Sequence, residues 1–260
     1  MPELKIGIQL AAIRQPIRKA LPIAASLGVS AVELDARGEL RPQALTRTGI
    51  RQLCKLFGDY QLRVAAISFQ TRRGYHVDED LDRRVEATRQ AMRLAADLGA
   101  SVVVNQLNVL PAADSGEDWS RLVGVLTDLG SFGHRVGATF AIRTGALDGE
   151  ALAPLLEALP ANSIGVELDP AELILHSHSP LETVQAIGGS VIHVHARDAV
   201  RDLSQGRDIE VPLGGGSAEF PQLLGELEQH RYRGYYTVSR HGGDDPLYEM
   251  GQAVKFLKRL

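Results

Sequence analysis

Short runs of β-branched and apolar residues alternate with longer amphipathic stretches from one end of the chain to the other. Eight of these runs predict strands, and each is followed by a helical pattern. The predicted strands cover residues 4–10, 31–34, 63–69, 101–106, 139–143, 164–169, 191–195 and 235–239. The predicted helices cover residues 17–26, 48–60, 81–98, 119–136, 150–159, 180–187, 221–230 and 246–260. Repeated units of one strand and one helix build a parallel sheet.

The number of units favours a closed sheet over an open one. Dividing 260 residues among eight units gives about 32 residues each, which suits a (β/α)8 TIM barrel spanning residues 1–260 as a single domain. The runner-up is a doubly wound sheet. No predicted strand is followed by the Gly-x-Gly-x-x-Gly pattern typical of that fold, because the one glycine cluster, residues 214–216, has Glu219 where the third glycine would stand.

Four predicted helices end just before a glycine that leads directly into the next strand. These glycines, Gly28, Gly99, Gly137 and Gly234, are predicted to be left-handed helix caps that return the chain to the sheet.

Composition and charge exclude several partners. The formal net charge of −4 and an aromatic content of 5% give no basic surface or stacking platform for nucleic acid. No apolar run approaches the roughly 18 residues that cross a bilayer, so we expect no membrane partner. Cys54 is the single cysteine and the first residues lack the apolar segment of a signal peptide, so we expect a cytoplasmic protein.

Polar side chains stand at the end of nearly every predicted strand. In a barrel these ends meet at one face, where the βα loops build the functional site. Solubility alone does not require polar residues there, so the pattern predicts a mouth that binds a small molecule. The candidate residues are Gln9, Glu33, Gln70, Asn105, Arg143, Asp169, His195 and Ser239.

Three segments carry a resemblance to a known family: LGVSAVEL near the start, VIHVHARD at residues 191–198, and VPLGGGSAEF beginning at residue 211. In these segments, and in the order of its elements along the whole chain, the sequence resembles the xylose isomerase-like TIM barrels. The resemblance implies a sugar or sugar-phosphate isomerase or epimerase that binds a small polyhydroxylated ligand at the carboxyl ends of the strands.

The resemblance also implies a metal site, which this sequence matches only in part. Members typically bind one divalent cation through residues ending strands five to eight: Glu, Asp, His and Glu. Asp169 and His195 match the middle two, whereas Arg143 and Ser239 replace the glutamates and Glu172 replaces a histidine three residues after the aspartate. Two negative charges are lost and one positive charge is gained. An arginine cannot coordinate a cation, so we expect that the metal site is lost and that no cofactor is needed.

Roles follow for the candidate residues if the chain is an enzyme. Arg143 would stabilise an enediolate oxygen, and His195 or Glu172 would move the proton. The substrate-binding residues implied by the resemblance and by the strand ends are Glu33, Gln70, Asn105, Asp169, Asp198 and Ser239.

Rival interpretations stay open at this stage. The main alternative is a non-catalytic barrel that binds a sugar, acid or phosphate. A metal-dependent phosphodiesterase would need more histidine and glutamate ligands and a basic face, neither of which the sequence offers. The acids Glu33, Asp35, Glu172 and Asp198 lie near strand ends and could gather around a relocated ion, although their spacing matches no ligand motif.

Individual side chains also have alternatives. Arg143 is expected to face Asp169, either in a structural ion pair or as a ligand-binding group. Arg197 is expected to be a solvated loop residue, and the role of His193 is open. The glycines at 214–216 are either an anion-binding turn or a flexible one.

Overall fold

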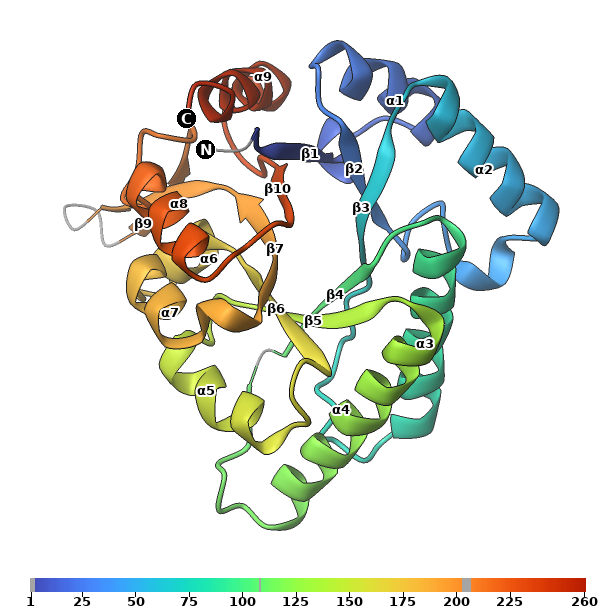
Figure 1. The fold of residues 1–260 in the computed structure, drawn as a ribbon, viewed down its shortest axis with the longest axis vertical. Coiled ribbons are helices and arrows are strands. Elements are labelled where there is room, and N and C mark those ends of the chain that lie inside the picture. The colour runs from blue at the N-terminus through green and yellow to red at the C-terminus, as the bar shows by residue number, and fades with distance from the viewer. Residues whose placement is uncertain (1–2, 108, 203–206) are drawn as a thin grey trace.

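A computed structural model describes residues 3–107, 109–202 and 207–260. Eight parallel strands close into a barrel in the order β1-β10-β7-β6-β5-β4-β3-β2 (Figure 1). The predicted (β/α)8 TIM barrel is therefore confirmed, with every predicted strand present. The barrel strands are β1 (Lys5–Gln9), β2 (Ala31–Asp35), β3 (Arg63–Ser68), β4 (Val102–Gln106), β5 (Thr139–Arg143), β6 (Ile164–Leu168), β7 (Val191–Ala196) and β10 (Tyr235–Val238).

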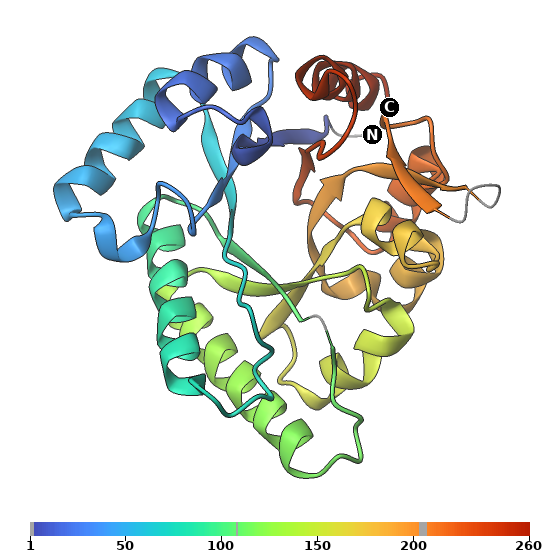
Figure 2. The same cartoon turned by 180° about the vertical axis from the view of Figure 1, so that it is seen from behind.

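Helices surround the barrel on its outer side (Figures 1 and 2). They are α1 (Ile17–Ser26), α2 (Arg47–Asp59), α3 (Leu81–Asp97), α4 (Glu117–Val136), α5 (Gly149–Ala158), α6 (Pro170–Leu175), α7 (Pro180–Ile187), α8 (Phe220–Gln229) and α9 (Pro246–Leu257). In the described part of the chain, none of these helices has the length and apolar character needed to span a bilayer.

Two elements were not expected from the sequence. Strands β8 (Asp198–Asp202) and β9 (Arg207–Val211) form an antiparallel hairpin after β7, and α6 is inserted between β6 and α7. The hairpin sequence is rich in charge and lacks a long apolar alternation, so it has the pattern of a loop. Helix α6 has only six residues, and its start is fixed by the Asp169 side chain, which accepts a hydrogen bond from the Glu172 backbone.

The glycine predictions are confirmed at three junctions and wrong at the fourth. Gly28, Gly99 and Gly137 have φ values of 70°, 78° and 83°, in the left-handed region. At the end of α8 that conformation belongs to Arg231 instead, with φ 59°. Gly234 is needed for close packing: a Cβ atom there would lie 2.7 Å from the Ile192 carbonyl oxygen.

The strands present different surfaces to the two sides of the barrel wall. Ile67, Val103 and Ile142 belong to the large apolar cluster that also contains the helix residues, so they face outward. The small separate cluster of Ala66, Val102, Val104 and Ala141 therefore lies inside the barrel. These small apolar side chains fill the part of the interior away from the carboxyl ends of the strands. Room for charged side chains is left at the carboxyl ends.

Candidate functional site

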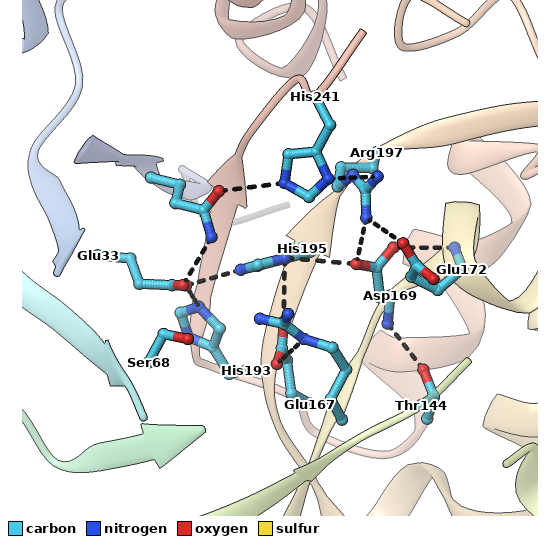
Figure 3. A network of polar contacts seen from close by, with 12 residues as sticks. Glu33, Ser68, Thr144, Glu167, Asp169, Glu172, His193, His195, Arg197 and His241 are labelled. Carbon is cyan, nitrogen blue, oxygen red and sulfur yellow. Dashed lines mark hydrogen bonds and ion pairs between the residues drawn. The ribbon is translucent and has the colours of Figure 1, made fainter. Parts of the chain in front are cut away.

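His195 lies at the centre of the barrel mouth among three carboxylates (Figure 3). Its Nε2 atom is 2.7 Å from Glu33 Oε2, and its Nδ1 atom is 3.1 Å from Glu167 Oε1 and 3.4 Å from Asp169 Oδ2. All four side chains are fully buried. They come from β2, β6, the residue after β6, and β7, so barrel closure brings together groups up to 162 positions apart.

The carboxylates determine the charge of His195. Burial alone lowers the pKa of this imidazole, but the charges of Glu167 and Glu33 outweigh burial and raise its pKa to about 10. His195 is therefore an imidazolium at neutral pH. A neutral ring would direct a lone pair at a carboxylate in either tautomer, from Nε2 at Glu33 or from Nδ1 at Glu167 and Asp169, which is the less favourable arrangement.

Glu33 accepts hydrogen bonds from three side chains. His193 Nε2 and His195 Nε2 both contact its Oε2 atom, at 3.2 and 2.7 Å, and Gln9 Nε2 donates to Oε1 at 3.1 Å. Burial by itself raises the pKa of Glu33, but the two histidines hold that pKa well below its usual value. The open question about His193 is thus answered, since the side chain is buried and anchors Glu33.

Arg197 joins the central carboxylates to the hairpin, which overturns the expectation that it is a solvated loop residue. Its guanidinium is 3% exposed, and Nη1 lies 2.8 Å from Asp169 Oδ2 and 3.1 Å from Glu172 Oε1 (Figure 3). Its Nε donates to Glu210 Oε1 at 3.0 Å. Burial by itself raises the pKa of Asp169, but Arg197 and His195 keep the pKa of this carboxyl far below its ordinary value. Arg197 is therefore a buried cation bound by three carboxylates.

Arg143 pairs with Glu167, and the expected contact between Arg143 and Asp169 is wrong. Arg143 Nε donates to Glu167 Oε2 at 2.8 Å. The reason is register, because Arg143 of β5 stands directly opposite Glu167 of β6. Asp169 lies beyond the strand end, where its backbone N–H donates to Thr144 Oγ1 at 2.9 Å and its side chain caps α6.

His241 forms the outer edge of the network. Its Nδ1 accepts a hydrogen bond from Arg197 Nη2 at 3.1 Å, and its Nε2 is 3.4 Å from Gln9 Oε1. Burial and the charge of Arg197 lower the pKa of His241. The ring is therefore neutral at neutral pH, and it is the one histidine of this network that is exposed.

Gln70 and Ser68 line a cavity of about 220 Å³ at the ends of β1, β2 and β3. Glu33 and Gln9 line the same cavity, so it adjoins the central network. The Gln70 side chain is also held by strand β4, since its Oε1 accepts a hydrogen bond from the Gln106 backbone N–H at 3.1 Å. This mouth cavity presents amide, hydroxyl and carboxylate groups.

Asn105 lies away from this cavity, in a buried network. Its side chain accepts from the Thr71 backbone N–H at 3.1 Å and donates to Tyr75 Oη at 2.7 Å. The phenol in turn contacts Thr88 Oγ1 at 2.7 Å. Through these hydrogen bonds, Asn105 of strand β4 holds the loop that joins β3 to α3, and Tyr75 of that loop contacts helix α3.

Asp198 binds backbone groups of its own region. Its two oxygens accept N–H groups from Ala199, Gly214, Gly216 and Ala218 at 2.9–3.1 Å. The glycine turn thus does bind an anion, but that anion is the carboxylate of Asp198. Both oxygens are thereby occupied.

Ser239 also stands apart from the three central carboxylates. With Arg197, Glu210 and Arg240 it lines a cavity of about 10 Å³, about the size of one water molecule. Its hydroxyl has no hydrogen-bond partner among the described residues.

Within the described residues, two groups of side chains offer ligand atoms close enough together to hold a metal ion: Glu33 with His193 and His195, and Glu167 with Asp169 and His195. In the first group the Nε2 protons point at Glu33. In the second group His195 Nδ1 and Glu167 Oε1 lie 3.1 Å apart as an ion pair but make no well-aligned hydrogen bond to any described residue, so these are the two atoms that a cation would take. Against this, guanidinium groups already contact both carboxylates of that group, and His195 would have to lose a proton.

Comparison with known proteins gives the family. The sequence model of the xylose isomerase-like TIM barrel family matches residues 21–260. The chain belongs to this family. The resemblance seen in the sequence is thereby confirmed. No curated protein sequence matches the chain.

Similar solved structures extend over nearly the whole barrel. A xylose isomerase domain protein from Planctomyces limnophilus is 22% identical, with a TM-score of 0.86 over 99% of this chain and 97% of its own. A xylose isomerase-like TIM barrel protein from Mycobacterium smegmatis, solved in complex with magnesium, is 15% identical (TM-score 0.81; 99% and 96% covered). A D-allulose 3-epimerase from Methylomonas sp. is 19% identical (TM-score 0.75; 99% and 98% covered). At these identities the similarity establishes the shared fold.

Sequence reasoning missed Glu167 and misjudged Arg197, and both had a detectable signal. Glu167 and Asp169 are two residues apart, as are His193, His195 and Arg197. Side chains spaced by two point to the same side of a strand. Placing His195 and Asp169 in the mouth therefore also places Arg197 and Glu167 near it.

Proposed function

We propose that this barrel binds a small polyhydroxylated compound in the mouth cavity, without a divalent ion. The observation that carries the proposal is the mouth cavity itself, where Gln9, Ser68 and Gln70 present two amides and a hydroxyl, and where Gln9 also contacts Glu33 of the central network. The cavity's amides and hydroxyl match the hydrogen-bonding groups of a sugar. The family, with its isomerase and epimerase structures, supports the same class of ligand.

The charge balance of the centre supports the absence of a metal. The three buried carboxylates, Glu33, Glu167 and Asp169, already have Arg143, Arg197 and protonated His195 as cationic partners. A divalent ion bound to Glu167 and Asp169 would have to displace the guanidinium groups that contact them. The guanidinium of Arg197 and the imidazolium of His195 thus provide the positive charge that a cation would supply.

Binding is the function that the geometry supports best, because the central acids are poorly placed to accept a proton. The pKa values of Glu33 and Asp169 are held low by their ion pairs, and both side chains are fully buried. A general base needs access to its substrate and a pKa nearer the working pH.

Isomerisation is the second candidate, and two observations favour it. Arg143 Nη2 is buried without a partner among the described residues, which leaves a donor for an enediolate oxygen. His241 is exposed and neutral, and Glu172, with its side chain 26% exposed, contacts Arg197. Either group would take a proton from the carbon beside a carbonyl and return it to the neighbouring carbon. Because the His195 side chain is fully buried, we propose a positioning role for it in place of direct contact with a substrate.

Calorimetric titration with a panel of aldoses, ketoses and their phosphates tests binding. Gln70→Ala and Ser68→Ala are expected to weaken binding of any active compound about tenfold, because each loses a hydrogen bond in the mouth cavity. The matched control is Gln52→Ala, an exposed residue of α2. Equal affinity of all variants would contradict the proposed site.

Solvent exchange separates binding from isomerisation. Incubation of a bound sugar in D₂O, followed by proton NMR, shows deuterium at the carbon beside the carbonyl only if a proton is removed. Exchange that is lost in His241→Asn or Glu172→Gln supports the isomerase. Binding without exchange supports the non-catalytic barrel.

A further inference from the structure

A second cavity, of about 440 Å³, lies beside the mouth cavity and is lined by arginines. Its walls come from the loop between β3 and α3, from the first turns of α3, and from the segment after β2. The lining residues are Arg37, Phe69, Thr71, Arg72, Arg73, Glu79, Asp80, Arg83, Arg84 and Ala87. Because strands β2 and β3 both end here, the cavity is on the same face of the barrel as the central network.

The charge of this arginine cavity is opposite to that of the whole chain. Five guanidinium groups against two carboxylates leave an excess of three positive charges, whereas the chain carries a net charge of −4. Arg37, Arg72 and Arg83 are exposed, and such a cluster of guanidinium groups at a concave surface creates a positive local potential that attracts anions. The arrangement therefore favours an anionic ligand.

Three of the arginines have no protein partner for their charge. Arg73 pairs with Glu79 at 2.7 Å, and Arg84 donates to the carbonyl oxygens of Val77 and Glu79. Across residues 3–107, 109–202 and 207–260, the guanidinium groups of Arg37, Arg72 and Arg83 have no hydrogen bond or ion pair. The Nε atom of Arg84 is buried and likewise lacks a partner there. These donors are available to a ligand.

The walls of the cavity are held in place before any ligand binds. Arg37 stacks on the Phe69 ring, with its guanidinium carbon 4.3 Å from the ring centroid. The loop is fastened at Thr71 and Tyr75 by buried Asn105. Such preorganisation lowers the entropy lost on binding.

Arg37 connects the two cavities, because it lines both of them. One ligand can therefore place hydroxyl groups beside Ser68 and Gln70 and an anionic end among the arginines. Guanidinium groups recognise phosphate through paired N–H donors, and three unpaired cations suit a dianion better than a single carboxylate.

We propose that the arginine cavity binds the phosphate group of a phosphorylated ligand whose polyhydroxylated part occupies the mouth cavity. This proposal rests on the proposed function, since it names the chemical class of the compound bound there. It assigns Arg37, Arg72 and Arg83 as the phosphate-binding side chains and Asn105 as a residue that positions their loop.

Titration calorimetry with inorganic phosphate, and with sugar phosphates beside their unphosphorylated sugars and sugar acids, tests the assignment. In Arg72→Ala/Arg83→Ala we expect affinity for inorganic phosphate and for sugar phosphates to fall about tenfold or more. Affinity for neutral sugars should not change. The charge-matched control is Arg18→Ala/Arg51→Ala, which removes two exposed arginines of α1 and α2 outside the cavity lining.

The outcomes separate this proposal from the proposed function. The phosphate assignment would be overturned if neutral sugars bound as tightly as their phosphates, or if the two double variants had equal affinity for phosphate. Neither result would contradict the assignment of the mouth cavity as the sugar-binding site. A preference for sugar acids over phosphates would also overturn the phosphate assignment. A different result would contradict the mouth cavity as the sugar-binding site: phosphate binding would depend on Arg72 and Arg83, but Gln70→Ala would not change the affinity for any sugar phosphate.

Discussion

Arg197 Nη1 lies 2.8 Å from Asp169 Oδ2, and neither side chain is accessible to solvent to a significant degree. The guanidinium belongs to the segment that joins β7 to the hairpin, and the carboxylate begins α6. This ion pair ties the hairpin to the barrel and gives Asp169 a cation supplied by the protein itself.

The first prediction concerns Arg197→Met, which keeps much of the side-chain length and removes the charge. Removing one partner of a buried ion pair leaves the other uncompensated, so we expect the free energy of unfolding to fall by about 3–5 kcal/mol. Urea denaturation measures the change. The matched control is Arg201→Met, an exposed arginine of the same hairpin, for which little change is expected. Equal stability of the two variants would contradict a buried role for Arg197.

The second prediction concerns metals. Dialysis against EDTA, or addition of Mn²⁺, should leave the melting temperature of the wild type unchanged. Arg143→Ala/Arg197→Ala removes both guanidinium groups beside Glu167 and Asp169, so Mn²⁺ should raise its melting temperature by binding the folded state. Stoichiometric metal in the purified wild type, lost to EDTA together with thermal stability, would contradict the proposed metal-independent centre.

The third prediction is a pH dependence of stability due to His195. Its pKa is raised from 6.5 to about 10 in the folded protein. A raised pKa stabilises the fold fully below pH 6.5, and this stabilisation declines between the two values and is lost as pH passes about 10. Urea denaturation at pH 6, 8 and 10 should show a steep decline for the wild type.

Two comparisons isolate the contribution of His195 from other groups that titrate near pH 10. His134→Gln, at an exposed position of α4, should show the wild-type decline, whereas His195→Gln should show a shallower one from a lower starting stability. Nitrogen NMR of the imidazole rings provides a direct measurement. A His195 ring that is already neutral at pH 8 would be inconsistent with the three-carboxylate environment.

The fourth prediction separates a structural from a ligand-binding role for Asp198. In Asp198→Ala, four backbone N–H groups lose their acceptor, so we expect the free energy of unfolding to fall by about 2–4 kcal/mol. Affinity for any ligand of the mouth cavity should be unchanged. Asp244→Ala, at an exposed loop position, is the control. A stable Asp198→Ala protein with weakened ligand binding would restore the sequence-based prediction that Asp198 contacts substrate.

Much of the architecture could be predicted because its signals are local. Strand positions follow from short apolar runs, and Gly28, Gly99 and Gly137 mark helix ends through a backbone conformation that suits glycine. The hairpin β8–β9 could not be predicted in this way, because its sequence lacks a repeating apolar pattern and it is held by contacts with distant residues such as Asp198 with Gly214 and Gly216. Helix α6 has a local start signal in Asp169 and Pro170, but its six residues are too few to show a helical apolar pattern.

The eight-unit barrel and the polar residues that end its strands follow from the sequence alone, because apolar alternation and capping act over a few residues. The pairings of Arg143 with Glu167 and of Arg197 with Asp169 arise only in the folded barrel. Those pairings depend on the register between neighbouring strands: Arg143 stands opposite Glu167 in the β5–β6 pair, and the register of the β6–β7 pair shifts at Val166/Glu167. A one-residue difference in register exchanges the side chains that meet, so the partners of buried charges are fixed only when the barrel closes.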